Sequence, residues 1–166
     1  MDSVLIHLSN QKKTGLEALS VTTTTSAKYP LPLSQLIRQV VSDRLWLAAD
    51  HQRVADDMLF RLHFRSSISR HYYAMYHAGR AVVYANHGGD DYERHSTLAR
   101  HLPPAMLNVL AHETELTNAR LLRNQADYDP YPAARDDWES EARNLAAVSA
   151  TFLQRCEDFA LSNGYI

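Results

Sequence analysis

The sequence predicts an all-α fold, an up-and-down bundle of four or five helices, and three observations lead to this prediction. Apolar residues recur at steps of three and four along the long segments after residue 33. No segment of comparable length alternates apolar and polar residues with the period of two that strands show. Only 5 glycines occur among 166 residues, a chain the size of one domain, whereas Ala, Leu and Arg, which favour helices, are abundant.

Residues 1–33 differ in composition from the rest of the chain. A Ser/Thr run lies within residues 21–26, a segment with two prolines follows over 29–32, and apolar periodicity is weak. We expect an N-terminal tail over 1–33 whose order depends on docking or on a partner, with a short helix around residues 16–19. The helical domain is expected over residues 34–166.

The first helix of this domain is predicted over residues 34–60. Ser34 follows the proline-containing segment and can cap the helix. Apolar residues keep helical spacing through the segment, at Leu36, Ile37, Val40, Val41, Leu45, Ala48, Ala55 and Leu59.

A second helix is predicted over residues 68–86. Ser66 or Ser67 can cap it, and Gly88 and Gly89 are placed to end it. The segment is apolar almost all round, which is typical of a central, buried helix rather than one on the surface.

Three further helical segments follow. A short helix is predicted over residues 95–101, before two prolines, and a longer one over 105–126. The longer helix must end before Pro130 and Pro132, which cannot continue the hydrogen-bond ladder. The last helix has acidic first turns, where the helix dipole favours negative charge, and Gly164 to end it. Its inward positions recur at Trp138, Ala142, Leu145, Ser149, Phe152, Cys156 and Phe159.

Composition restricts the class of protein. The formal net charge of −2 gives no argument for a polyanion partner from charge alone. The single cysteine, Cys156, excludes an internal disulfide framework and occupies an apolar helical position, where a buried thiol is expected. No apolar run approaches the ~20 residues that span a bilayer, and the N-terminus has no signal-peptide pattern. We therefore expect a cytoplasmic protein without membrane contact.

The histidines do not predict a metal site. Nine are present, but no HxxxH or HExxH pattern places two imidazoles one helical turn apart. We therefore predict no metal site, and no motif indicates a cofactor. Every basic residue after residue 28 is Arg, the better residue for bidentate phosphate recognition, although a genome rich in G and C would give the same bias.

A polar stripe is predicted on the otherwise apolar second helix. Its members follow one another at steps of three and four and so share one face: Arg70, Tyr73, His77, Arg80 and Tyr84. Guanidinium, imidazole and phenol groups that face a cleft can hold a phosphodiester or a nucleotide. The alternative interpretation is a solvated face or a dimer seam.

A second polar constellation closes the helix predicted over 105–126. Arg120, Arg123, Asn124 and Asp127 lie within one helical face. A local Arg123–Asp127 ion pair is the simple explanation of two of these residues. The functional interpretation is a fixed polar site at a helix end that a proline-containing turn stiffens.

Two segments together resemble a known family. Residues 66–78, Ser-Ser-Ile-Ser-Arg-His-Tyr-Tyr-Ala-Met-Tyr-His-Ala, resemble the second-helix signature of HEPN domains, and His95 after the following loop fits the same pattern. Residues 122–129, Leu-Arg-Asn-Gln-Ala-Asp-Tyr-Asp, resemble the element that closes the fourth helix in a large HEPN subgroup. The resemblance covers about residues 34–162.

The resemblance implies a helical bundle of HEPN type that dimerises, with the ends of both fourth helices in a shared cleft. Catalytic HEPN members cleave RNA without a metal and use an Arg, then four to six residues, then a His. Many are toxins or antiviral effectors encoded beside a minimal nucleotidyltransferase, which attaches AMP to a tyrosine near the motif.

The chain departs from this nuclease pattern. Arg123 and Asn124 match the start of the motif, but the positions of the histidine hold Tyr128, Asp129 and Pro130. Cleavage of RNA without a metal requires a group that moves the 2′-hydroxyl proton, and a phenol with a pKa near 10 is a poor base.

The leading hypothesis is therefore a homodimeric RNA- or nucleotide-binding, regulatory component of a toxin–antitoxin or phage-defence system, with a minimal nucleotidyltransferase as a partner. The first alternative is an endoribonuclease in which Arg123 and Asn124 are catalytic and His77 or His95 supplies the base. The second is a scaffold without a ligand. The expected binding residues are Arg120, Asp127, Tyr128, Asp129, Arg70, His77 and Arg80.

Overall fold

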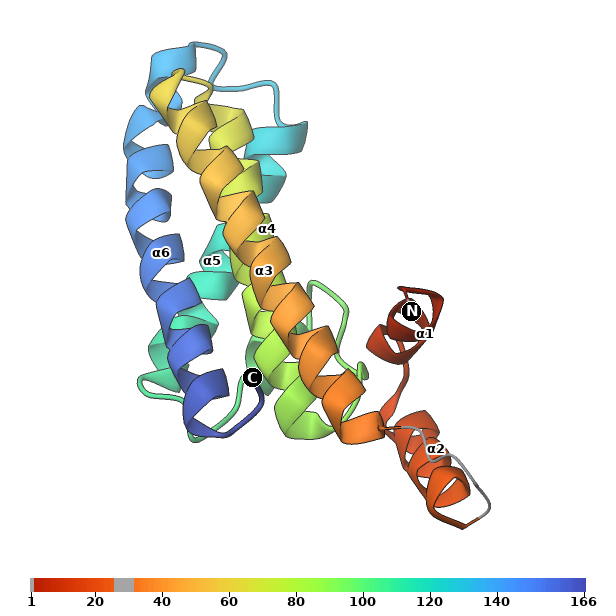
Figure 1. Ribbon diagram of the computed structural model, residues 1–166. Helices are drawn as coiled ribbons and strands as arrows, with labels where there is room; N and C mark the ends of the chain where they lie inside the picture. The colour runs from red at the N-terminus through yellow and green to blue at the C-terminus, as the bar shows by residue number, and fades with distance from the viewer. Residues whose placement is uncertain (1, 26–31) are drawn as a thin grey trace.

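The computed structural model describes residues 2–25 and 32–166, and every regular element in them is helical. The order is α1 (Asp2–Ser9), α2 (Lys13–Thr25), α3 (Leu33–Phe60), α4 (Phe64–His87), η1 (Leu98–His101), α5 (Val109–Tyr128), η2 (Arg135–Trp138) and α6 (Glu139–Ser162). The all-α prediction is thus confirmed, with six α-helices in the described ranges and no strand there. The long helices lie roughly along one axis, and α1 and α2 lie on the other side of α3 from α6 (Figure 1).

Helix α4 is the centre of the bundle, as we predicted from its segment being apolar almost all round. It packs against α3, α5 and α6, and most of its side chains are buried, including Tyr72 at 1% exposure and Met75 at 0%. Gly79 lies where these helices meet, because a Cβ there would stand 3.4 Å from Leu116 and 3.5 Å from Phe152. The tight packing fixes which face of α4 remains open for a site.

The connection between α3 and α4 is shorter than the sequence predicts. Helix α4 begins at Phe64, which is 1% exposed, so the prediction that Ser66 or Ser67 caps it at residue 68 is wrong. The buried Ser67 hydroxyl instead donates to the Ala55 carbonyl of α3 at 3.0 Å. A hydrogen bond across the two helices has replaced the local cap that a serine favours in isolation.

The ends of the other helices agree with the predictions in outline. Helix α4 ends at His87, before Gly88, whose φ of 85° lies in the left-handed region, and Gly164 with φ 67° follows α6. The predicted helix over 95–101 is a single 3₁₀ turn, η1. Helix α5 begins at Val109, later than predicted, because the chain first passes Asn108 with φ 58°.

The N-terminal segment is docked through apolar side chains and through its backbone. Leu8 of α1 is 1% exposed and Leu16 of α2 is 4% exposed, and both belong to the core. The Tyr84 hydroxyl donates to the Leu8 carbonyl at 3.0 Å. The predicted helix at residues 16–19 lies within α2, and residues 26–31 of the predicted tail lie outside the described residues.

The segment after α4 fits closely against the start of α2. A Cβ on Gly89 would stand 2.2 Å from the Lys13 backbone nitrogen. The Asp90 N–H donates to the Gln11 carbonyl at 2.8 Å, and the Lys13 N–H donates to the Asp91 carboxylate at 2.8 Å. The two chain segments therefore meet backbone to backbone, with no room for a side chain at Gly89.

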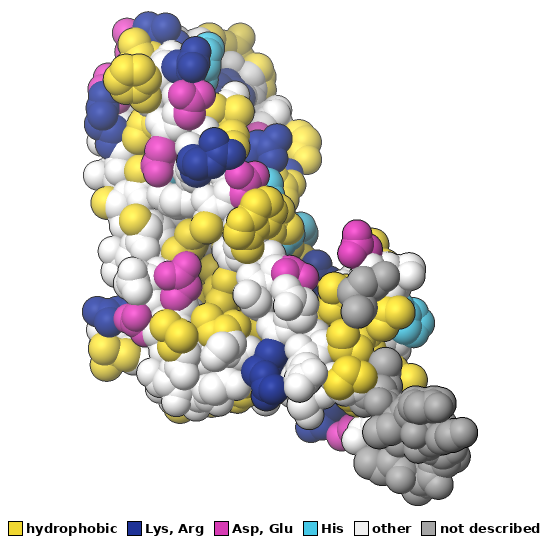
Figure 2. Space-filling model, in the orientation of Figure 1, with side chains coloured by type: hydrophobic (Ala, Val, Ile, Leu, Met, Phe, Trp, Pro, Cys, Tyr) yellow, Lys and Arg dark blue, Asp and Glu magenta, His cyan; other side chains and the backbone are white. Residues whose placement is uncertain are grey.

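The core and surface agree with two further expectations from composition. Cys156 is buried at 0% exposure, and burial raises the pKa of its thiol, so the thiol is unreactive. Within residues 2–25 and 32–166, no helix is both long and apolar enough to span a bilayer. Positive and negative side chains are interspersed over the face in Figure 2, with apolar side chains between α3 and α6.

Candidate functional site

The last turn of α5 holds a guanidinium fixed on several sides. Arg123 Nη2 donates to the Tyr73 hydroxyl of α4 at 2.6 Å, and Nη1 donates to Asn124 Oδ1 at 3.2 Å. Arg123 Nε lies 2.7 Å from Asp127 Oδ2 in an ion pair. The guanidinium also lies over the rings of Tyr73 at 5.2 Å and Tyr128 at 5.5 Å. We call Arg123, Asn124, Asp127 and Tyr128 the Arg123 turn.

Arg65, which the sequence did not single out, stabilises this turn from α4. Its Nε donates to the Ala126 carbonyl at 2.7 Å and its Nη2 donates to the Asp129 carbonyl. The guanidinium lies 4.8 Å over the Trp138 ring. A cation at the C-terminal end of a helix is favourable because the last carbonyls lack helical partners. Asp129 therefore contributes its backbone carbonyl here, and its side chain is exposed.

Beside the Arg123 turn lies a set of stacked rings from α3, α4 and the loop after α4. We call the rings of His51, Tyr73, Tyr76, His77 and His95 the aromatic surface. His51 stacks on His77 with centroids 5.2 Å apart and planes 2° apart, and His95 stacks on Tyr76 at 4.2 Å. Tyr73 joins the two halves, at 5.7 Å from His51 and 6.1 Å from His95.

The aromatic surface is continuous with the Arg123 turn, because the hydroxyl of Tyr73, a member of the aromatic surface, accepts a hydrogen bond from Arg123. The structure thus brings together two constellations that the sequence placed on separate helices. His95 is exposed, and His51, Tyr73 and His77 are partly exposed, so solvent reaches the stacked rings. A flat ligand can reach them in the same way.

The imidazoles of this surface are neutral at pH 7. Burial lowers the pKa of His77 to about 4, with the charges of His51, Arg44 and Arg80 adding to the effect. Burial and then Arg70 lower the pKa of His51. Burial lowers the pKa of His95, and the positive charges of Arg123 and Arg120 lower it further. Each ring therefore offers one N–H donor and one lone pair.

A hydrogen bond to a buried tyrosine determines which nitrogen of His95 carries the proton. The Tyr72 hydroxyl lies 2.5 Å from His95 Nδ1, and burial raises the pKa of Tyr72, so the hydroxyl keeps its proton. His95 Nδ1 is the one acceptor that the described residues provide for that proton. His95 Nδ1 therefore accepts the hydrogen bond, and Nε2 carries the N–H.

Two arginines flank the aromatic surface without a carboxylate partner among the described residues. Arg70 is exposed and donates to His51 Nδ1 at 3.5 Å, and Arg120 is partly exposed with neither a hydrogen bond nor an ion pair in the described ranges. Uncompensated guanidiniums beside accessible rings are suited to phosphate recognition. The fields of Arg120 and Arg123 act on both Tyr72 and His95.

The stripe predicted on α4 is divided between two places. Arg70, Tyr73 and His77 border or form the aromatic surface. Arg80 instead binds the Asp90 carboxylate, with Nε donating to Oδ1 at 2.8 Å, and the buried Tyr84 binds α1. No pattern in the sequence pointed to His51, because a histidine on the partly polar face of α3 has no motif around it.

No group of three or more His, Cys, Asp or Glu side chains in the described part of the chain could hold a metal ion. The chemistry that this arrangement provides is therefore that of stacking, hydrogen bonding and positive charge.

No protein-family model matches the sequence, and neither a curated protein nor a solved structure shows significant similarity to the chain.

Proposed function

We propose that the protein is a HEPN-like module that binds single-stranded RNA on the aromatic surface and the Arg123 turn. In this proposal it acts as a homodimer and as the regulatory component of a toxin–antitoxin or phage-defence pair with a minimal nucleotidyltransferase. The observation that carries the proposal is the aromatic surface, where His51 stacks on Tyr73 and His77 and where His95 meets Tyr73 edge-on. Arg70 and Arg120 border it, and neither has a carboxylate partner among the described residues.

Single-stranded RNA fits this surface better than a duplex does. Its unstacked bases can lie on aromatic and imidazole rings, each contact being worth about 1–3 kcal/mol, while guanidiniums bind the phosphates. A neutral imidazole can donate to a base carbonyl or to a phosphate oxygen. Since the net charge is −2, affinity has to come from these local contacts rather than from a general positive field.

The tautomer of His95 favours binding over cleavage. His95 is exposed and its Nε2 carries the N–H, so this nitrogen is a donor toward a ligand. A general base needs a free lone pair at that nitrogen, and providing one would deprive the buried Tyr72 hydroxyl of its acceptor. The resemblance to HEPN domains without the nuclease histidine agrees with this argument.

A direct binding assay tests the proposal. Fluorescence anisotropy with a labelled single-stranded RNA that has a 5′-hydroxyl, in about 50 mM salt, should give saturable binding that weakens at about 200 mM. His95→Ala should weaken binding by about tenfold, since one stacked base is lost. Arg120→Gln should weaken binding by a similar factor and reduce its dependence on salt.

The matched control is Arg143→Gln on α6, because Arg143 is exposed and its one partner among the described residues is Glu139. This variant should bind RNA like the unmodified protein. If the RNA does not bind at low salt, or if the control loses as much affinity as Arg120→Gln, the proposed site is wrong.

Endoribonuclease activity is the second candidate, because one observation favours it. His95 lies 6.1 Å from the Tyr73 ring, whose hydroxyl accepts from Arg123, so an imidazole and the motif arginine border the same surface. If the protein cleaves RNA without a metal, incubation with RNA in the presence of a chelator should yield products with 2′,3′-cyclic phosphate ends. Loss of these products in both Arg123→Ala and His95→Ala would support cleavage, and their absence from the unmodified protein would exclude it.

A further inference from the structure

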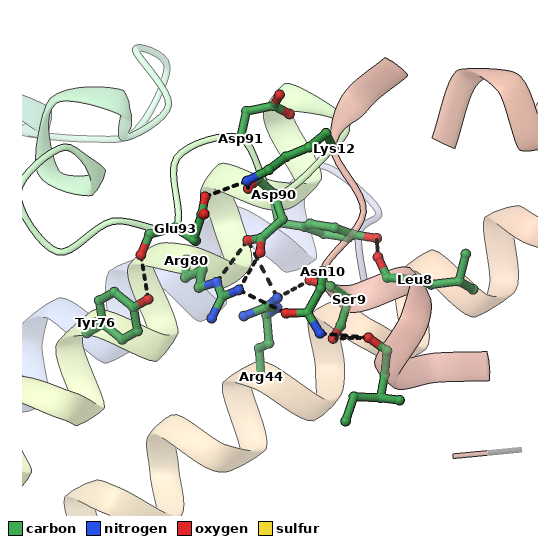
Figure 3. Close-up of polar contacts among 12 residues, drawn as sticks. Leu8, Ser9, Asn10, Lys12, Arg44, Tyr76, Arg80, Asp90, Asp91 and Glu93 are labelled. Carbon is green, nitrogen blue, oxygen red and sulfur yellow. Dashed lines mark hydrogen bonds and ion pairs between the residues drawn. The ribbon is translucent and has the colours of Figure 1, made fainter. Parts of the chain in front are cut away.

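A second polar cluster lies where α1 meets α3 and α4, and the aromatic surface does not use it. Arg44 and Arg80 both face the Asp90 carboxylate, which Arg80 binds through Nε at 2.8 Å and through Nη2 (Figure 3). Arg44 Nη2 lies 3.6 Å from Asp90 Oδ1 and donates to the Ser9 carbonyl. The side chains of Arg44 and Asp90 are 9% and 3% exposed.

The cluster has more positive than negative charge. Two guanidiniums share one buried carboxylate, and Arg80 Nη2 reaches only the neutral Asn10 Oδ1 beyond it, at 3.3 Å. Burial and the charge of Arg80 lower the pKa of Arg44 to about 10. Arg44 Nε is buried with no hydrogen-bond partner among the described residues. A buried donor without a partner is costly. Since two guanidiniums share one carboxylate, an added anion near them would stabilise the cluster.

The neighbouring charges do not remove this excess. Lys12 Nζ lies 2.6 Å from the Asp90 carbonyl and 2.6 Å from Glu93, so this pair is neutral as a whole. Asp43 also lines the adjoining cavity, but it is exposed, and its carboxylate accepts from Gln39 at 2.7 Å. The buried part of the cluster therefore keeps its excess of positive charge.

A cavity of about 290 Å³ adjoins the cluster. Arg44, Arg80 and His77 are among the residues that line it, and so are the apolar Leu5, Ile6 and Leu47. The cavity thus combines cationic and apolar lining, and its size approaches the ~300 Å³ at which ligand pockets begin.

We propose that this cavity binds a phosphomonoester of a nucleoside, with the phosphate on Arg44 and Arg80 and the nucleoside against Leu5 and Leu47. Guanidiniums bind phosphate with paired donors, and a monoester carries the larger charge that two cations balance. The ligand is a free nucleotide or the 5′-phosphate end of an RNA strand. Helix α1 forms part of the wall, so binding also stabilises its docking. The inference does not depend on RNA binding at the aromatic surface.

Calorimetry on the full chain with AMP, inorganic phosphate and adenosine tests the inference. AMP should bind and raise the melting temperature, phosphate should bind more weakly, and adenosine should not bind. The informative pair of variants is at Ile6, which is 65% exposed and therefore replaceable without loss of the fold. Ile6→Glu brings a carboxylate to the rim of the cavity and should weaken the binding of AMP by at least about tenfold, or 1.4 kcal/mol. Ile6→Gln, of the same size, should stay within about threefold.

Arg44→Gln should abolish AMP binding, and the Ile6 pair keeps the test decisive if that variant does not fold. Competition then distinguishes the two sources of the phosphate. If a 5′-phosphorylated RNA displaces AMP and its 5′-hydroxyl form does not, the RNA end is the ligand; if neither does, it is the free nucleotide.

Absence of AMP and phosphate binding, equal binding of adenosine, or equal behaviour of the two Ile6 variants would overturn the inference. These results are separate from those of the proposed function although His77 borders both sites, because RNA with a 5′-hydroxyl carries no terminal phosphate for Arg44 and Arg80.

Discussion

Replacing Asp90 by asparagine tests how the N-terminal segment is fixed. The substitution keeps the shape of the side chain and one acceptor oxygen, but it removes the one carboxylate that faces both Arg44 and Arg80. All three side chains are at most 16% exposed, so water replaces little of the lost attraction. Breaking a buried ion pair by removing one partner costs about 3–5 kcal/mol, which for a chain of this size lowers Tm by about 10 °C.

Two measurements check this expectation. Chemical denaturation should show a loss of about 3 kcal/mol, and trypsin should cleave after Lys12 or Lys13 faster than in the unmodified protein, because α1 is released. The control is Asp57→Asn, because the Asp57 side chain is 58% exposed and its one partner in the described ranges is the exposed Arg61, at 2.9 Å. This pair should contribute less than about 1 kcal/mol. Equal destabilisation by both substitutions, or unchanged proteolysis of Asp90→Asn, would refute the reasoning.

Three further outcomes are expected. Arg65→Gln should lower the free energy of unfolding by about 2 kcal/mol and weaken RNA binding, because Arg65 donates to two carbonyls at the end of α5. Denaturation and anisotropy measure the two effects, and the control Arg61→Gln should change neither. Burial lowers the pKa of His71 to about 4, so its contribution to stability is present above pH 6.5 and is lost as pH falls toward 4. Urea titrations should show that His71→Gln loses about 2 kcal/mol less than the unmodified protein does between pH 7 and 5. Sedimentation velocity should give a dimer that Leu121→Asp disrupts, because Leu121 and Tyr128 on α5 are 48% and 71% exposed; a monomer at all concentrations would contradict the proposed homodimer.

Most of the helical fold could be predicted from periodicity. The spacing along α3 and α6 and the glycines after α4 and α6 are local signals, and they gave the ends of these elements closely. The start of α4 could not be predicted, because the hydroxyl that looks like a cap is bonded to Ala55 on a different helix. The docking of α1 was hidden for a similar reason, since it depends on a buried pairing of Arg44 and Asp90 that lie far apart in the chain.

The candidate site was predictable only in part. Helical spacing placed Tyr73 and His77 on one face, and the segment around Arg123 drew attention through its composition. The rings of His51 and His95 join them from other elements, and no sequence spacing relates residues across a tertiary contact. Arg80 shows the opposite error, because correct spacing assigned it to a surface when a buried carboxylate binds it instead.

The two adjacent glycines after α4 are required for different reasons, and mutagenesis could tell them apart. Gly88 is constrained by torsion alone, since its φ is 85° and nothing lies within 4 Å of where a Cβ would stand. An asparagine, which tolerates that conformation, should therefore be accepted there. Gly89 is constrained by volume, because even one methyl group would collide with the backbone of Lys13. Alanine at position 89 should therefore separate the segment after α4 from the start of α2 without changing any charge.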